Sequence, residues 1–95
     1  MAYRLSQKAE EDIIQIYIAG MDMFGADQAE RYHEGLEHTF KFLSDFPFAA
    51  AERTELKSLS RVHPYRSHII IYRLDGADIL IQRVRHGSED WIRQP

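Results

Sequence analysis

Three residues in the second half of the chain, Arg61, Arg83 and His86, have side chains of the kinds needed to cleave RNA at a 2′-hydroxyl. That reaction requires a group that takes up the hydroxyl proton, a cation that stabilises the phosphorane and a group that protonates the leaving oxygen. His86 is the only acid–base candidate with an arginine nearby on an expected strand. However, Arg83 and His86 are three positions apart, so a regular strand would place them on opposite faces. The main expectation is therefore no catalytic residue, with Arg61, Arg83 and His86 as the alternative catalytic set.

The same side chains also fit structural roles. His86 would close the last strand and bond a backbone carbonyl. Arg73 and Arg83 would pair with carboxylates on the helices, because a half-buried arginine is usually paired. Glu37 and Asp12 are the candidate partners. Both roles remain open on the sequence alone.

No pattern indicates a metal or a cofactor. The chain has no cysteine, so thiolate metal sites and disulfides are excluded. His33 and His38 are five positions apart, which does not place both on one helix face as metal ligands need. Gly25 and Gly87 are isolated turn residues and form no phosphate-binding loop. We therefore expect no metal site and no cofactor.

Length and charge favour one small domain with two different surfaces. The chain has 95 residues and a formal net charge of −3, which suits a single domain over 1–95 and argues against a simple nucleic-acid binder. Residues 1–52 hold four basic and ten acidic side chains, whereas residues 53–95 hold eight basic and five acidic ones. No apolar run approaches the ~20 residues of a membrane span, and the N-terminus lacks a signal-peptide pattern. We expect a cytoplasmic protein.

Periodicity predicts an α+β domain of two layers. A short strand over 3–5 precedes helices over about 7–21 and 27–45, which a short connection makes antiparallel neighbours. After an irregular stretch, strands are expected over 61–63, 68–74 and 78–85, the last two joined by the tight turn Asp75-Gly76. The order is β-α-α-β-β-β, with the helical hairpin packed on one face of an antiparallel sheet.

The first helix carries more apolar surface than one sheet needs. One apolar face contains Ala9, Ile13 and Ile16 and is expected in the core. Beside it lies a second stripe that contains Ile14, Ile18 and Met21. This stripe either fills the core or contacts a partner, since adjacent exposed apolar side chains commonly mark an interface.

Several short segments carry a family resemblance. Residues 3–13 form a strand ending in Ser and then a helix with Ala and Asp-Ile, and residues 25–29 begin the second helix in a similar way. The strongest segment is the apolar run ending in Tyr72-Arg73, followed by a turn and Ile-x-Ile-x-Arg-Val-x-His over 79–86. Pro47 and Arg53 precede the sheet. This ordered set, from Tyr3 to about Trp91, resembles the RelE/ParE toxin superfamily and is most similar to its ParE branch.

The resemblance implies the toxin of a type II toxin–antitoxin system. In ParE-like members a ParD-like antitoxin wraps the toxin and inserts apolar side chains between the helical hairpin and the sheet, which implies a hetero-oligomer. The target of ParE toxins is DNA gyrase, and we expect inhibition by binding. The expected antitoxin-binding residues are Ile14, Ile18, Met21, Arg61 and Arg73. The expected target-binding residues are Arg83, Arg85, His86 and Trp91.

Two other functions remain open. The RelE branch of the superfamily cleaves mRNA on the ribosome with a cluster of Lys and Arg and a Tyr, His or Glu near the C-terminus. Here only Lys57 among the lysines lies in the sheet half, and no tyrosine follows His86. The third possibility is a non-toxic module that still binds an antitoxin.

Overall fold

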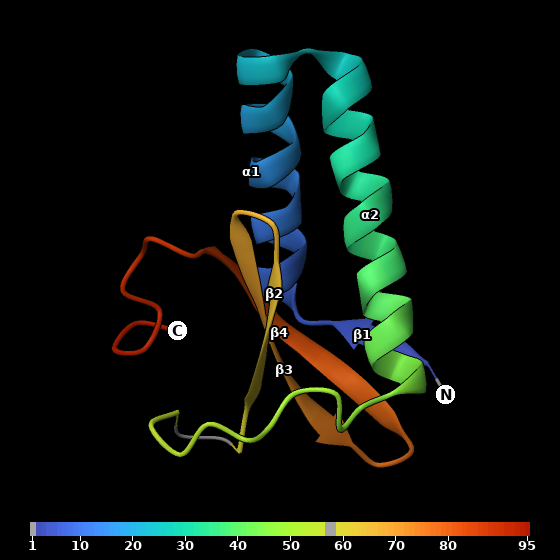
Figure 1. Ribbon diagram of the computed structural model, residues 1–95, viewed down its shortest axis with the longest axis vertical. Helices are drawn as coiled ribbons and strands as arrows, with labels where there is room; N and C mark the ends of the chain where they lie inside the picture. The colour runs from blue at the N-terminus through green and yellow to red at the C-terminus, as the bar shows by residue number, and fades with distance from the viewer. Residues whose placement is uncertain (1, 57–58) are drawn as a thin grey trace.

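The computed structural model describes residues 2–56 and 59–95, which form two helices and one sheet. The elements are β1 (Tyr3–Leu5), α1 (Gln7–Phe24), α2 (Ala26–Asp45), β2 (Arg61–Tyr65), β3 (His68–Asp75) and β4 (Asp78–His86). The β-α-α-β-β-β order and the two-layer α+β architecture are as expected. Figure 1 shows the two helices side by side, with their far ends rising past the sheet. In the part of the chain described, neither helix is both long and apolar enough to cross a membrane.

Local capping sets the helix ends. Ser6 precedes α1, and its Oγ accepts a hydrogen bond from the Ala9 amide at 3.0 Å, which satisfies one of the free donors of the first turn. Gly25 alone joins the helices. Its φ of 90° lies in the region that favours glycine, and its amide donates to the Met21 carbonyl at 3.1 Å. So short a connection keeps α1 and α2 antiparallel.

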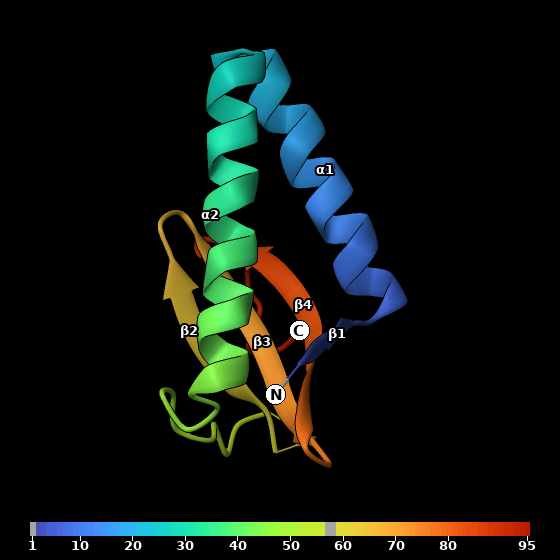
Figure 2. The ribbon, with the colours of Figure 1, turned by 90° about the vertical axis from the view of Figure 1, so that its right-hand side faces the viewer.

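The sheet is mixed, with strand order β1-β4-β3-β2. Strands β2, β3 and β4 are antiparallel as expected, but β1 pairs with β4 in parallel, with Tyr3 opposite Ile79 and Leu5 opposite Ile81. The expectation of an antiparallel sheet therefore does not extend to β1. Parallel neighbours need a long crossover, and here the helical hairpin, β2 and β3 lie between the two strands. Figure 2 shows β1 beside β4.

Strand β2 continues past its predicted end at His63. It runs through Pro64 to Tyr65, which lies opposite His68 across a two-residue turn. Proline is tolerated there because β2 is an edge strand, where a missing amide leaves no ladder bond unmade. The same missing donor makes this edge a poor template for strand addition.

A β-bulge at Gln82 decides which side chains of β4 reach the core. Ile71 pairs with Arg83 and Tyr72 pairs with Ile81, so Gln82 is the extra residue on β4. The bulge reverses the alternation, and Val84 therefore follows Ile79 and Ile81 onto the face that the helices cover. The core formed there contains Ala9, Ile13, Leu36, Phe40, Leu43, Ile70, Tyr72, Ile79, Ile81 and Val84.

Side chains cap the outer edge of β4 where β1 no longer covers it. Ser6 Oγ donates to the Gln82 carbonyl at 2.7 Å, and the Asp12 carboxylate accepts from the Val84 amide at 3.0 Å. Further along, Glu89 Oε1 accepts from the His86 amide at 2.8 Å. An uncapped edge would expose backbone groups that favour pairing with another chain. These three contacts cover that edge, and those of Ser6 and Asp12 also tie the start of α1 to the sheet.

Helix α2 and strand β2 interlock at a glycine. Tyr65 lies against Gly35, and its hydroxyl donates to the Tyr32 carbonyl at 3.2 Å. A Cβ at position 35 would overlap the Tyr65 hydroxyl and lie 3.0 Å from its Cζ. Gly35 is thus needed for close approach rather than for an unusual backbone conformation.

Gly35→Ala should destabilise the protein by about 1–2 kcal/mol, because overpacking at Tyr65 outweighs the better helix propensity of alanine, which is worth up to about 1 kcal/mol. Urea unfolding followed by circular dichroism measures the effect. In a Tyr65→Phe background the overlapping hydroxyl is gone, so the same substitution should cost less. An equal cost in both backgrounds would contradict the proposed contact.

Candidate functional site

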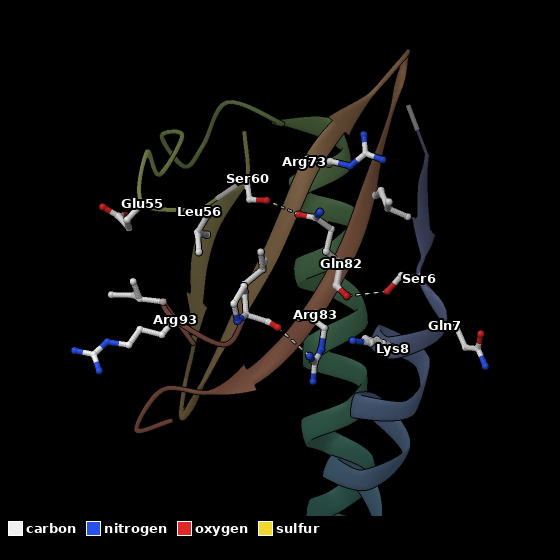
Figure 3. A pocket seen from close by; sticks show the side chains of 14 residues that line it. Ser6, Gln7, Lys8, Glu55, Leu56, Ser60, Arg73, Gln82, Arg83 and Arg93 are labelled. Carbon is white, nitrogen blue, oxygen red and sulfur yellow. Dashed lines mark hydrogen bonds between the residues drawn. The ribbon is translucent and has the colours of Figure 1, made fainter. Parts of the chain in front are cut away.

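The face of the sheet opposite the helices carries a pocket of about 560 Å³. The open face of β3 and β4 forms its floor, the first residues of α1 close one side, and residues 55–56, 60 and 92–95 close the other. Figure 3 shows this arrangement. The apolar part of the lining consists of Leu56, Ile71, Leu80 and Ile92. Ser60 donates a hydrogen bond to Gln82 in the middle of the pocket at 2.6 Å. The volume is within the range of about 300–1,000 Å³ that ligand pockets usually have.

The rim of this pocket is cationic. Lys8 and Arg73 line it, and neither side chain has a hydrogen-bond or ion-pair partner among residues 2–56 and 59–95. In Figure 3, Lys8 lies near Arg83 at one end of the pocket, and Arg73 lies near the other. Glu55 is the only carboxylate side chain in the described lining, and Arg53 pairs with it. The pocket therefore combines an apolar floor with unneutralised positive charge. Arg73 does not form the helical ion pair considered from the sequence.

Arg83 is held by a helical carboxylate. Its Nε and Nη2 donate to the two oxygens of Asp12 at 2.7 and 3.0 Å, and its Nη1 donates to the Pro95 carbonyl at 3.1 Å. The hydrogen bond to Asp12 raises the pKa of Arg83 above its ordinary value. The pairing with Asp12 considered from the sequence is thus present. Such a bidentate contact leaves little of the guanidinium free for a ligand.

Arg61 is buried and holds the loop before β2. It donates to the Ala50 carbonyl at 2.6 Å and to Glu52 at 3.3 Å, and its guanidinium lies 5.0 Å from the ring centroid of Phe48. Close by, the buried Tyr72 hydroxyl donates to the Pro47 carbonyl at 2.9 Å. These contacts fix the path of residues 47–52, and they use Nη1 and Nη2 of Arg61, whereas its buried Nε has no hydrogen-bond partner among the described residues.

His86 lies at the end of β4, in a second pocket of about 310 Å³ between α1 and the hairpin of β3 and β4. Its Nδ1 accepts a hydrogen bond from the Ser88 amide at 3.1 Å and lies 2.6 Å from Ser88 Oγ. The expected bond to a backbone carbonyl is therefore wrong. An Nδ1 that accepts from an amide carries no proton, so this ring bonds a donor instead.

Two residues that the sequence analysis did not single out join His86. The ring of His68, its cross-strand neighbour, lies 5.3 Å away, and Tyr32 Oη is 2.6 Å from His68 Nδ1. Burial lowers the pKa of His68, and the neighbouring His86 lowers it further. A two-residue turn at Gly76-Ala77 would by itself place position 68 opposite 85, and the bulge moves His68 opposite His86, so the sequence carried no signal for this pair.

The remaining expected site residues lie on three different surfaces. Ile14, Ile18 and Met21 are exposed on α1. Arg85 pairs with Glu89 at 3.2 Å at the end of β4, and the ring of Trp91 lies 5.2 Å from the Arg53 guanidinium. Arg83 and His86 line the smaller pocket together, but Arg61 lines neither pocket. Within residues 2–56 and 59–95, no three metal-ligating side chains gather where they could hold an ion.

Comparisons with known proteins agree on one family. Residues 3–91 match the family model of the ParE toxin of the type II toxin–antitoxin system parDE. The chain is 30% identical over 86 residues to Toxin ParE1 of Caulobacter vibrioides, covering 90% of this chain and 88% of that protein. A solved structure of the chromosomal ParDE system from P. aeruginosa superposes with a TM-score of 0.78 at 20% identity, covering 90% of this chain and 95% of the other.

The Asp12–Arg83 contact should be a major source of stability. The side chains are only 16% and 21% exposed, so removing one partner leaves a largely desolvated charge. Asp12→Asn and Arg83→Met should each cost about 2–4 kcal/mol in urea unfolding. The double variant should lose at least about 1 kcal/mol less than the sum of the two. Strict additivity would show that the charges do not interact, and Asp45→Asn, at an exposed ion pair, is the control expected to change little.

The lowered pKa of His68 predicts a pH dependence. The folded protein binds fewer protons at this ring than the unfolded chain, so its contribution to stability is complete above the unfolded pKa of about 6.5. That contribution is lost as the pH falls from there toward the folded pKa. His68→Gln should therefore lose less melting temperature than the wild type between pH 7.5 and 5.5. Parallel pH profiles would contradict this assignment. His63→Gln is the matched comparison, because burial lowers the pKa of His63 as well.

Proposed function

Because the chain belongs to the ParE toxin family of type II toxin–antitoxin systems, we propose that it inhibits DNA gyrase by binding and that a ParD-like antitoxin neutralises it. On this proposal the toxin acts in the cytoplasm, forms a hetero-oligomer with its antitoxin and contributes no cleavage chemistry. Any trapped DNA break would arise from the chemistry of gyrase.

The observation that carries the proposal is the engagement of the two arginines that a ribonuclease would need. Arg61 holds Ala50 and Glu52, and Arg83 is bound by Asp12. His86 accepts from the Ser88 amide through Nδ1 only. A nuclease needs a free cation beside an acid–base group, since the phosphorane charge must be stabilised where the proton moves. This arrangement supports a binding toxin over the RelE-like alternative.

The proposed antitoxin contact centres on the exposed stripe of α1. Ile14, Ile18 and Met21 are 56%, 48% and 44% exposed, and they follow helical spacing, so one amphipathic segment can cover all three. Burying them would contribute about 25 cal/mol per Å² of apolar surface removed from water. Arg73, which has no partner in the described part of the chain, is available to pair with an antitoxin carboxylate. Arg61 would contribute chiefly by shaping the loop before β2.

The proposed gyrase contact lies at the end of β4 and in the residues that follow. Arg85 and His86 are the last two residues of β4, and Trp91 folds back toward Arg53. Arg83 binds the Pro95 carbonyl and so helps to position this segment. Tryptophan and arginine are the side chains that contribute most often to tight protein contacts, which supports this segment as the target surface.

Purified toxin should inhibit supercoiling by gyrase and produce cleavage complexes on plasmid DNA, and excess antitoxin should reverse both effects. Arg85→Gln and Trp91→Ala should weaken inhibition by about tenfold or more, whereas Lys41→Gln, on the exposed side of α2, should not. Gyrase that is unaffected by a stoichiometric excess of folded toxin would exclude the proposed target. Primer extension on cellular mRNA is the companion measurement, and cuts lost in His86→Ala would favour the endonuclease alternative.

A further inference from the structure

One ridge of α1 presents apolar side chains between two carboxylates. Glu10, Ile14, Ile18 and Asp22 follow one another at intervals of four residues, so they form a single row on the helix surface. All four are exposed. Neither the carboxylate of Glu10 nor that of Asp22 has an ion-pair or hydrogen-bond partner among the described residues. We call this row the acidic ridge.

The pocket on the open face of the sheet has the complementary pattern. Its floor is aliphatic, and the unpaired Lys8 and Arg73 lie toward opposite ends of it. Two apolar side chains between two carboxylates would thus meet an apolar floor between two cations. Opposite charges aligned across an interface steer association and fix its register. We call this pocket the basic pocket.

We propose that the free protein associates head to tail, with the acidic ridge of one copy seated in the basic pocket of the next. The two surfaces lie on different layers of the molecule, because α1 belongs to the helical layer and the pocket opens on the other face of the sheet (Figures 1 and 3). Such a contact is heterologous, so it leaves one surface free at each end of a dimer and can propagate.

A second copy fits this pocket better than a nucleic-acid strand does. Single-stranded nucleic acid is bound largely by stacking its bases on aromatic side chains, and the described pocket lining contains no aromatic residue. The charge distribution favours the same occupant, since residues 1–52 have ten acidic and four basic side chains and residues 53–95 have the opposite excess. This inference does not depend on the proposed gyrase or antitoxin contacts.

The contact is weak by its size. The ridge consists of two isoleucines and their flanking carboxylates. The surface area that these four side chains can bury is smaller than the roughly 1,200–2,000 Å² buried in stable interfaces. We therefore expect association in the micromolar range that weakens as salt rises, because part of the attraction is between exposed charges. Sedimentation velocity of the toxin without antitoxin should show a weight-average mass that increases with concentration beyond a dimer at low salt.

Paired variants distinguish a head-to-tail contact from a symmetric one. Ile18→Lys places a cation on the acidic ridge, and Lys8→Glu reverses one charge of the basic pocket. Both positions are exposed, so both variants should fold, as circular dichroism can verify. Each alone should weaken self-association by about tenfold or more, equal to about 1.4 kcal/mol. Mixed together, they still offer one intact pocket and one intact ridge, so they should form a one-to-one dimer that does not grow.

The controls make each outcome decisive. Lys41→Glu changes an exposed charge on α2, outside both surfaces, and should associate like the wild type. Arg73→Glu should behave like Lys8→Glu at the other end of the basic pocket. A wild type that stays monomeric at its highest soluble concentration in low salt overturns the proposal. So does a mixture of the two paired variants that shows no dimer, or a Lys8→Glu variant that dimerises as well as the wild type.

Discussion

The carboxylate of Asp12 joins the helical layer to the sheet, and much of the remaining structure depends on that contact. It binds Arg83 with both oxygens and also accepts from the Val84 amide, directly after the bulge in β4. Both charged groups are largely withdrawn from water, so neither is stable in this environment without the other. The bulge turns Val84 into the core and lets Arg83 reach the first turns of α1, and Asp12 accepts from the Val84 amide on the edge of β4 that β1 does not cover.

The same contact limits the chemistry of the sheet face. Arg83 is neutralised by Asp12, and Arg61 holds the loop before β2. The two arginines of the alternative catalytic set therefore have structural roles. The positive charge of Lys8 and Arg73 remains available beside an aliphatic floor, and Glu55, the carboxylate side chain of the described lining, is paired with Arg53. A surface of this composition can bind an anionic, partly apolar partner. The imidazoles of His68 and His86 lie in the other pocket, which Arg83 also lines.

Sequence patterns identified the elements and the family because those depend on local signals. Ser6 lies where a strand gives way to a helix, Gly25 lies between the two helices, and the tight turn Asp75-Gly76 between two strands indicates a hairpin. The parallel pairing of β1, the continuation of β2 through Pro64 and the loop contacts of Arg61 were not foreseen, because each depends on which strand lies next to which. The bulge at Gln82 was also missed. It has no residue signature of its own and follows from burying Ile79, Ile81 and Val84 together. For Arg83 the sequence allowed either a catalytic role or a structural pairing with a helical carboxylate. Only the packing of α1 against β4 shows that Arg83 pairs with Asp12.

The two-layer fold also explains how a chain with a small net charge can carry two opposed surfaces. The acidic residues are concentrated in the helical hairpin and the basic ones in the sheet half, so the layers separate the charges in space as well as in sequence. The exposed isoleucines of α1 belong both to the proposed antitoxin contact and to the proposed contact between copies. One side chain cannot be buried by two partners at once, so antitoxin binding and self-association would draw on the same free toxin. By mass action, the tighter of these two binding partners, the antitoxin or a second copy of the toxin, would then determine what fraction of the toxin keeps an exposed acidic ridge.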